Sequence, residues 1–188
     1  MKKSSKKITK KSKPFSRLSK SEKRVAIAKD VLGQLKLKKI VAERGVYVDI
    51  PLLDNEEGKQ LQSLLKKKQC NCCALGSCFV SLVRKENKFI IKHKHIRNSI
   101  KNGYIGKEDF RSRLKKYFTQ LQLDLIESAF EGNVNHTDGD TTSDKFSYAH
   151  KFHDKFRTID KSMTKQQQND CLVAIMKNII ANKGTFNP

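Results

Sequence analysis

Apolar residues recur at helical spacing along most of the chain. Ser19 followed by Glu22 forms a capping-box pattern, and apolar positions then repeat every three or four residues up to residue 35. Residues 72–83 are apolar on nearly all sides, as is typical of a buried helix. The further segments with helical spacing are 55–68, 107–117, 120–131, 146–156 and 164–182. The pattern predicts a mainly α-helical protein, a compact domain of about six helices.

Three segments depart from this pattern. Residues 41–50 carry β-branched residues around a glycine, which predicts a short extended segment or hairpin arm. Residues 132–144 are almost wholly turn formers, so we expect a flexible acidic and polar loop. Residues 1–18 are mostly Lys and Ser, with too few apolar side chains to offset the entropy of ordering them. We therefore expect a disordered basic arm, 1–18, and a single helical domain, 19–188.

Charge is distributed unevenly along the chain, whose net charge is +21. Residues 1–39 hold 15 Lys or Arg against only Glu22 and Asp30, and residues 84–116 hold 12 basic against 3 acidic residues. A polycation that neutralises phosphates releases condensed counterions, which gives salt-dependent affinity without base-specific contacts. The two basic segments therefore indicate a polyanionic partner.

Aromatic residues are interleaved with the second basic segment. Bases can stack on Phe89, His93, His95, Tyr104 and Phe110 while the cations contact phosphates. The alternative is that these rings belong to the core and the charges to a solvated face. The cations predicted to contact nucleic acid are Lys2, Lys3, Lys6, Lys7, Lys10, Lys11, Lys13, Arg17, Lys20, Lys92, Lys94, Arg97, Lys101, Arg111 and Arg113.

Cysteine and histidine residues form a weaker candidate site for a metal. Cys70, Cys73 and Cys78, with His93 and His95 about 20 residues further on, have the elements of a tetrahedral zinc site. Cysteines in an apolar helical run are, however, more often small hydrophobic residues of the core. We therefore favour the structural role and expect no cofactor, with zinc as the alternative.

A second weak candidate lies in the C-terminal third. His150, His153 and Asp154 fall within one helical turn and, with Asp138 or Asp140, have the ligand types of a metal-dependent nuclease. His153 shares a face with apolar residues, so a packing role fits it better. The sequence contains no phosphate-cradling glycine loop, nucleophile elbow or zinc-protease motif. We expect no enzymatic activity and assign no catalytic residue.

The expected environment follows from cysteine usage and hydropathy. Five cysteines, an odd number with two adjacent, make a poor disulfide framework and favour a reducing compartment. No apolar run resembles a membrane span or a secretory signal. These features predict a cytoplasmic protein without membrane contact. A mitochondrial transit peptide is the weaker alternative, because such peptides favour Arg where this arm uses Lys.

Three blocks of the sequence stand out together: CNCCALG at 70–76, LDLIESAFEG at 123–132 and AIMKNIIANKGTFNP at 174–188. They resemble a group of small, uncharacterised proteins from bacteriophages and bacterial mobile elements. The resemblance covers residues 22–188. It implies a mostly helical domain and a phage or mobile-element setting, and it brings no assigned activity and no catalytic residue.

Charge and resemblance together predict a non-enzymatic phage or mobile-element protein that binds nucleic acid through phosphate contacts. It would act as a virion, genome-associated or RNA-associated component. The alternative is a protein-interaction module that regulates or inhibits a host factor. For docking on an acidic protein partner, the same charges would steer association.

Overall fold

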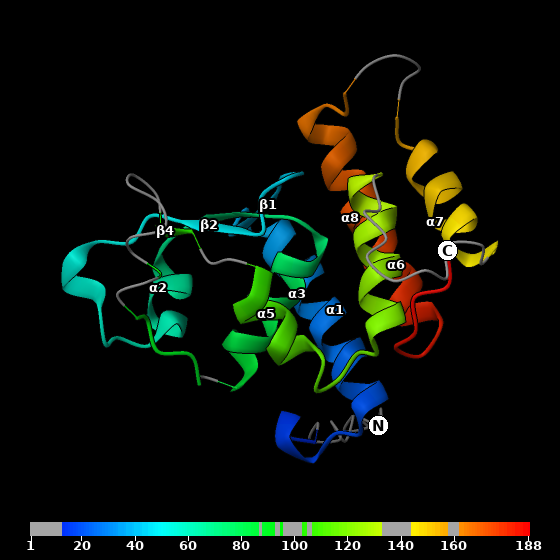
Figure 1. Cartoon of the computed structure of the whole chain (residues 1–188). Helices are drawn as coiled ribbons and strands as arrows, with labels where there is room; N and C mark the ends of the chain where they lie inside the picture. Colours follow the sequence, from blue (N-terminus) through cyan, green and yellow to red (C-terminus); the bar gives the residue numbers. More distant parts are fainter. Residues whose placement is uncertain are drawn as a thin grey trace, which may run out of the picture.

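A computed structural model describes residues 13–86, 88–92, 95, 103–104, 107–132, 144–157 and 162–188. Within these residues, seven α-helices accompany a small four-stranded sheet, so the predicted mainly α-helical class is confirmed (Figure 1). Most of the predicted arm, residues 1–12, lies outside the described part. The prediction of a disordered arm is wrong for residues 13–18, which include the 3-10 turn η1 (Phe15–Arg17), because Phe15 packs against the core.

Two long helices pack against each other, α1 (Lys20–Lys36) and α8 (Lys165–Ala181). The predicted capping box of α1 is present: the backbone N–H of Glu22 donates to Ser19 Oγ at 3.2 Å, and the N–H of Ser19 donates to the Glu22 carboxylate at 2.8 Å. Thr164 caps α8 in the same way. The predicted starts of both helices are therefore confirmed. A capping side chain accepts hydrogen bonds from backbone N–H groups that have no partner within the helix, and this local interaction can be read from the sequence.

The central helix is α3 (Ala74–Glu86). It contacts α1, α2 (Leu61–Lys67), α5 (Lys107–Leu114) and α6 (Gln120–Glu131), and all its residues from 74 to 83 are buried. In Figure 1, α1, α3, α5 and α6 lie together in the middle, α2 lies to the left of them, and the sheet runs along the upper side. The core is thus built around the most apolar segment of the chain, which is the behaviour predicted for a helix buried on most sides.

The cysteine-rich segment starts as a strand rather than as part of the buried helix. Strand β3 (Cys70–Cys72) pairs in parallel with β1 (Ile40–Ala42) and antiparallel with β2 (Val48–Ile50). The prediction that residue 72 begins the helix was therefore wrong. Cys70 and Cys72 are buried, while Asn71 between them is half-buried. This alternation is typical of a β-strand, in which successive side chains point to opposite faces of the sheet.

The extended segment predicted at 41–50 is confirmed in part. The sheet order is β1-β3-β2-β4, where β4 is Gly103–Tyr104. The ends of the predicted segment form β1 and β2, but the two strands do not pair as a hairpin because β3 lies between them. This arrangement needs a partner from a segment about 20 residues downstream, which local patterning does not reveal.

The predicted helix over residues 55–68 is shorter than expected. Residues Asp54–Glu56 form a 3-10 turn, η2, and α2 begins only at Leu61. Between them Gly58 adopts a left-handed φ of 76°, which interrupts a right-handed helix.

The C-terminal half packs around α6. The predicted N-cap of α6, Thr119, accepts a hydrogen bond from the N–H of Gln122. The helix ends at Gly132, which has a left-handed φ of 70°, and this end was also predicted. Helix α7 (Asp144–Asp154) packs against α6. Most of the predicted loop at 132–144, residues 133–143, lies outside the described part. After α8 the chain ends in a tail that buries Phe186 in the core.

Candidate nucleic-acid interface

The two basic segments meet at one end of the molecule. The rings of Phe15 in η1 and Tyr117, just after α5, pack edge to face with centroids 6.3 Å apart. Lys23 Nζ lies 5.7 Å from the Phe15 centroid and 5.1 Å from the Tyr117 centroid. Arg24 Nη1 donates to the carbonyl oxygen of Tyr117 at 2.7 Å. These contacts join the start of α1 to residues that follow it by more than 90 positions.

The end of α3 joins the same surface. Glu86 accepts a hydrogen bond from the hydroxyl of Tyr117. Arg113 Nη2 donates to the carbonyl oxygen of Lys88 at 2.7 Å, and the Arg113 guanidinium lies 5.0 Å from the centroid of the Phe89 ring. Glu86, Lys88 and Phe89 therefore lie beside the last turn of α5 and the residues that follow it.

Eight cations from these segments are exposed or half-exposed, and together they are called the basic end: Lys13, Arg17, Lys20, Lys23, Lys88, Arg113, Lys115 and Lys116. None of them forms an ion pair with a carboxylate of the residues that the structure describes. The acidic side chains beside them are engaged, Glu22 in capping α1 and Glu86 with Tyr117. The surface therefore carries a net positive field. In Figure 1 it occupies the lower edge, where η1 and the start of α1 lie.

The structure brings some of the predicted nucleic-acid contacts together and leaves others elsewhere. Lys13, Arg17, Lys20 and Arg113 belong to the basic end. Lys92 is exposed but is not part of the basic end. Its neighbour Ile91 forms backbone hydrogen bonds with Gly58 and Lys59. The predicted residues outside the described part are Lys2, Lys3, Lys6, Lys7, Lys10, Lys11, Lys94, Arg97 and Lys101. Four members of the basic end were not singled out from the sequence, although their charge-rich segments were: Lys23, Lys88, Lys115 and Lys116.

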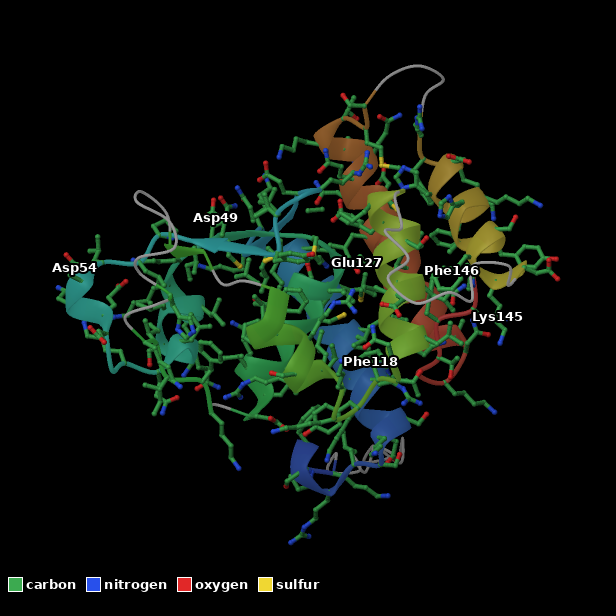
Figure 2. All side chains as sticks on the ribbon, viewed as in Figure 1. Asp49, Asp54, Phe118, Glu127, Lys145 and Phe146 are labelled. Atoms are coloured by element: carbon green, nitrogen blue, oxygen red, sulfur yellow. The ribbon has the colours of Figure 1, made fainter. Side chains whose placement is uncertain are left out.

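Arg111 is occupied inside the fold. Its guanidinium donates to Asp124 Oδ1 at 2.9 Å and to Glu127, and its side chain is only 11% exposed. The hydroxyl of Tyr47 also donates to Glu127, at 3.2 Å. Figure 2 shows Glu127 on the side of α6 that faces the sheet and α3. Because two carboxylates neutralise its charge, Arg111 is poorly suited to binding a phosphate. Arg113, two positions later, forms no ion pair with a described carboxylate.

The aromatic residues of the second basic segment mostly belong to the core. Phe89 is 5% exposed, His95 3% and Phe110 0%. Phe79 packs against both Phe89 and Phe110, with centroids 5.2 and 6.2 Å apart, and the His95 ring stacks on Phe89. The prediction that bases stack on these three rings is wrong, and the core alternative is confirmed for them. His93 and the side chain of Tyr104 lie outside the described part.

The cysteines proposed as zinc ligands are buried. The thiol of Cys72 lies 3.6 Å from Cys70 Sγ in β3, and burial raises the pKa of Cys78 to about 12 and that of Cys73 still further. The thiols of Cys73 and Cys78 are therefore neutral and behave as small apolar groups. The His95 ring stacks on that of Phe89. The described residues contain no group of three or more Cys, His, Asp or Glu able to hold a metal ion.

The histidine proposed for a nuclease site packs in the core. His153 is 2% exposed, and its Nδ1 lies 3.3 Å from the carbonyl oxygen of Ala129. Burial lowers the pKa of His153, which favours the neutral ring. Its packing role, expected from the shared apolar face, is confirmed. Asp138 and Asp140 lie outside the described part, and His150 is half-buried on the same helix.

The chain matches no protein-family model, no curated protein and no solved structure. The interpretation of the basic end therefore depends on its own charge, exposure and contacts. Among the described helices none combines the length and the apolar character that crossing a bilayer requires.

Proposed function

We propose that this protein binds nucleic acid through phosphate contacts, without catalysis, and that the basic end is the contact surface. One observation carries the proposal: segments far apart in sequence contribute eight cations to one surface, and no described carboxylate pairs with them. Such a surface gains affinity by releasing counterions from a phosphate backbone. In a phage or mobile-element setting this is the role of a virion, genome-associated or RNA-associated component.

The sequence before Lys13 adds further positive charge. Residues 1–12 contain six lysines and no acidic residue, and they join the fold at a member of the basic end. Once the basic end has bound, tethered cations are held at a high effective concentration beside the same backbone. We therefore expect the arm to increase the affinity and the salt dependence of binding.

The test compares two double charge reversals in salt titrations of labelled duplex and single-stranded nucleic acid. Lys115→Glu/Lys116→Glu changes the basic end. Lys66→Glu/Lys67→Glu is the matched control: both lysines are exposed at the end of α2. The carbonyl oxygen of Lys67 accepts from Lys39 at 3.4 Å, which places the control pair near the far end of α1, about 25 Å from its start.

We expect the Lys115/Lys116 variant to bind more weakly. The slope of log affinity against log salt should fall by roughly 1 for each phosphate that the variant no longer neutralises. The Lys66/Lys67 variant should bind nearly as the unaltered protein does. Equal weakening in both variants would contradict the assignment of the surface. An unaltered chain that binds no nucleic acid at low salt, but retains one acidic protein after nuclease treatment, would favour the interaction module instead.

A further inference from the structure

A shallow groove lies between the first turns of α6 and α7 and the C-terminal tail. Its cavity measures about 130 Å³ and is lined by apolar groups of Leu121, Leu125, Tyr148, Phe186 and Pro188. Leu121 is 39% exposed and Tyr148 is 52% exposed, and both are among the most exposed large apolar side chains of the described residues. Together they provide a small apolar surface, open to water, at the edge of the cavity.

One charged side chain, that of Lys145, lines the groove. Lys145 lines it from the start of α7, and no acidic side chain is among its lining residues. Figure 2 shows Lys145 at this end of α7. Lys151 is not a lining residue, but it follows Tyr148 by three positions on α7, and its Nζ lies 5.5 Å from the centroid of the exposed Tyr148 ring. An exposed ring with an amine beside it suits a flat group that carries a negative charge at its edge.

The groove adjoins the basic end. Leu121 follows Lys116 by only five residues, across the turn that leads into α6. Arg24 ties the tail to this region, because its Nε donates to the carbonyl oxygen of Gly184 at 2.6 Å and its Nη1 to that of Tyr117 at 2.7 Å. These two hydrogen bonds hold the C-terminal tail, which lines the groove, next to the residues that follow α5.

The size of the cavity limits what enters it. Cavities that enclose a whole small molecule measure roughly 300–1,000 Å³. At about 130 Å³ the groove admits one flat group while the rest of the ligand stays outside. An unpaired nucleobase fulfils this condition, since its π-face can stack on Tyr148 while the adjoining phosphates remain at the rim beside Lys145 and Lys151.

We propose that the groove takes one unpaired base of a single-stranded nucleic acid, stacked on Tyr148, with the flanking phosphates at Lys145 and Lys151. The inference rests on the proposed function and adds the class of substrate. Bases inside a duplex are already stacked and paired, so a duplex reaches only the basic end. The protein therefore prefers single strands with exposed bases over a duplex of the same sequence.

The test uses a strand with one 2-aminopurine, as DNA and as RNA, alone and annealed to its complement. The probe is read without tryptophan background, because the chain contains none. Tyr148→Ala removes the stacking ring, and Tyr148→Phe keeps it. Leu53→Ala is the matched control, since Leu53 is an apolar side chain 59% exposed beside η2. Thermal unfolding checks that all three variants are folded.

We expect Tyr148→Ala to weaken single-strand binding roughly tenfold, to abolish 2-aminopurine quenching and to leave duplex affinity unchanged. Tyr148→Phe and Leu53→Ala should behave like the unaltered chain. Duplex and single strand bound equally, with no effect of Tyr148→Ala, would overturn the groove assignment and leave the basic end intact. Failure of the unaltered chain to bind any nucleic acid would instead contradict the proposed function.

Discussion

A Cβ atom on Gly76 would lie 1.5 Å from the carbonyl oxygen of Tyr47. The start of α3 thus touches the backbone that leads into β2, and the contact exists only because residue 76 has no side chain. The adjoining backbone is held as well, since the N–H of Cys73 donates to the carbonyl oxygen of Val46 at 2.6 Å. The segment CNCCALG therefore joins the central helix to the sheet.

We expect Gly76→Ala to lower the free energy of unfolding by about 3 kcal/mol, because the clashing atom belongs to the backbone and cannot swing aside. Urea denaturation monitored by circular dichroism measures the change. Gly33→Ala is the control: Gly33 lies in α1, with no atom within 4 Å of an added Cβ, and the substitution should stabilise the helix by about 0.5–1 kcal/mol. Equal midpoints for the two variants would contradict the contact.

Two neighbouring arginines should separate stability from binding. Arg111→Ala leaves Asp124 and Glu127 without their cation, so we expect a decrease of about 2–3 kcal/mol in unfolding free energy and no change in nucleic-acid affinity. Arg113→Ala should weaken binding and cost about 1 kcal/mol, from its hydrogen bond to Lys88 and its contact with Phe89. Denaturation and salt-dependent binding titrations on both variants give the answer. The prediction would be refuted if Arg111→Ala weakened nucleic-acid binding while Arg113→Ala left it unchanged.

Stability should fall as the pH drops below about 6.5, in part because of His153. Burial, and then the positive charge of Arg44, lower the pKa of His153 in the folded protein. Between the lowered and the ordinary pKa the unfolded chain binds more protons than the folded one, so stability is present at higher pH and lost on acidification. Thermal unfolding across this range should show a shallower decrease for His153→Gln than for the unaltered chain.

The control for that experiment is His150→Gln, at the half-buried histidine of the same helix. It should keep the pH dependence of the unaltered protein. If His150→Gln and His153→Gln flatten the dependence equally, the buried ring is not its source.

The C-terminal tail should contribute to stability through Phe186. This ring is 1% exposed and lies edge to face with Phe152 at a centroid distance of 5.5 Å. Phe186→Ala opens a cavity in the core, and we expect a decrease of about 3–4 kcal/mol in unfolding free energy. Thr185→Ala, at an exposed neighbour, should change it by less than about 0.5 kcal/mol. Calorimetry that finds similar melting temperatures for both variants would mean that the tail is not docked in solution.

Local signals in the sequence predicted the helix ends well. Ser19, Thr119 and Thr164 cap three helices where expected, because a capping side chain acts on backbone groups only two or three residues away. Strand β3 was not predicted, because it depends on contacts with residues distant in the sequence. Cys70–Cys72 reads as the start of an apolar helix, and only pairing with β1 and β2, both distant in sequence, makes it a strand.

The sequence by itself determined that the protein is mainly helical and that its charge is concentrated in two segments, because periodicity and composition are properties of the chain alone. The tertiary structure decided which charges are available. It holds Arg111 between two carboxylates and leaves the side chain of Arg113 half-exposed. It also brings the start of α1 beside Tyr117. Which charges are neutralised and which are exposed depends on contacts between segments remote in sequence, and those contacts exist only once the core has packed.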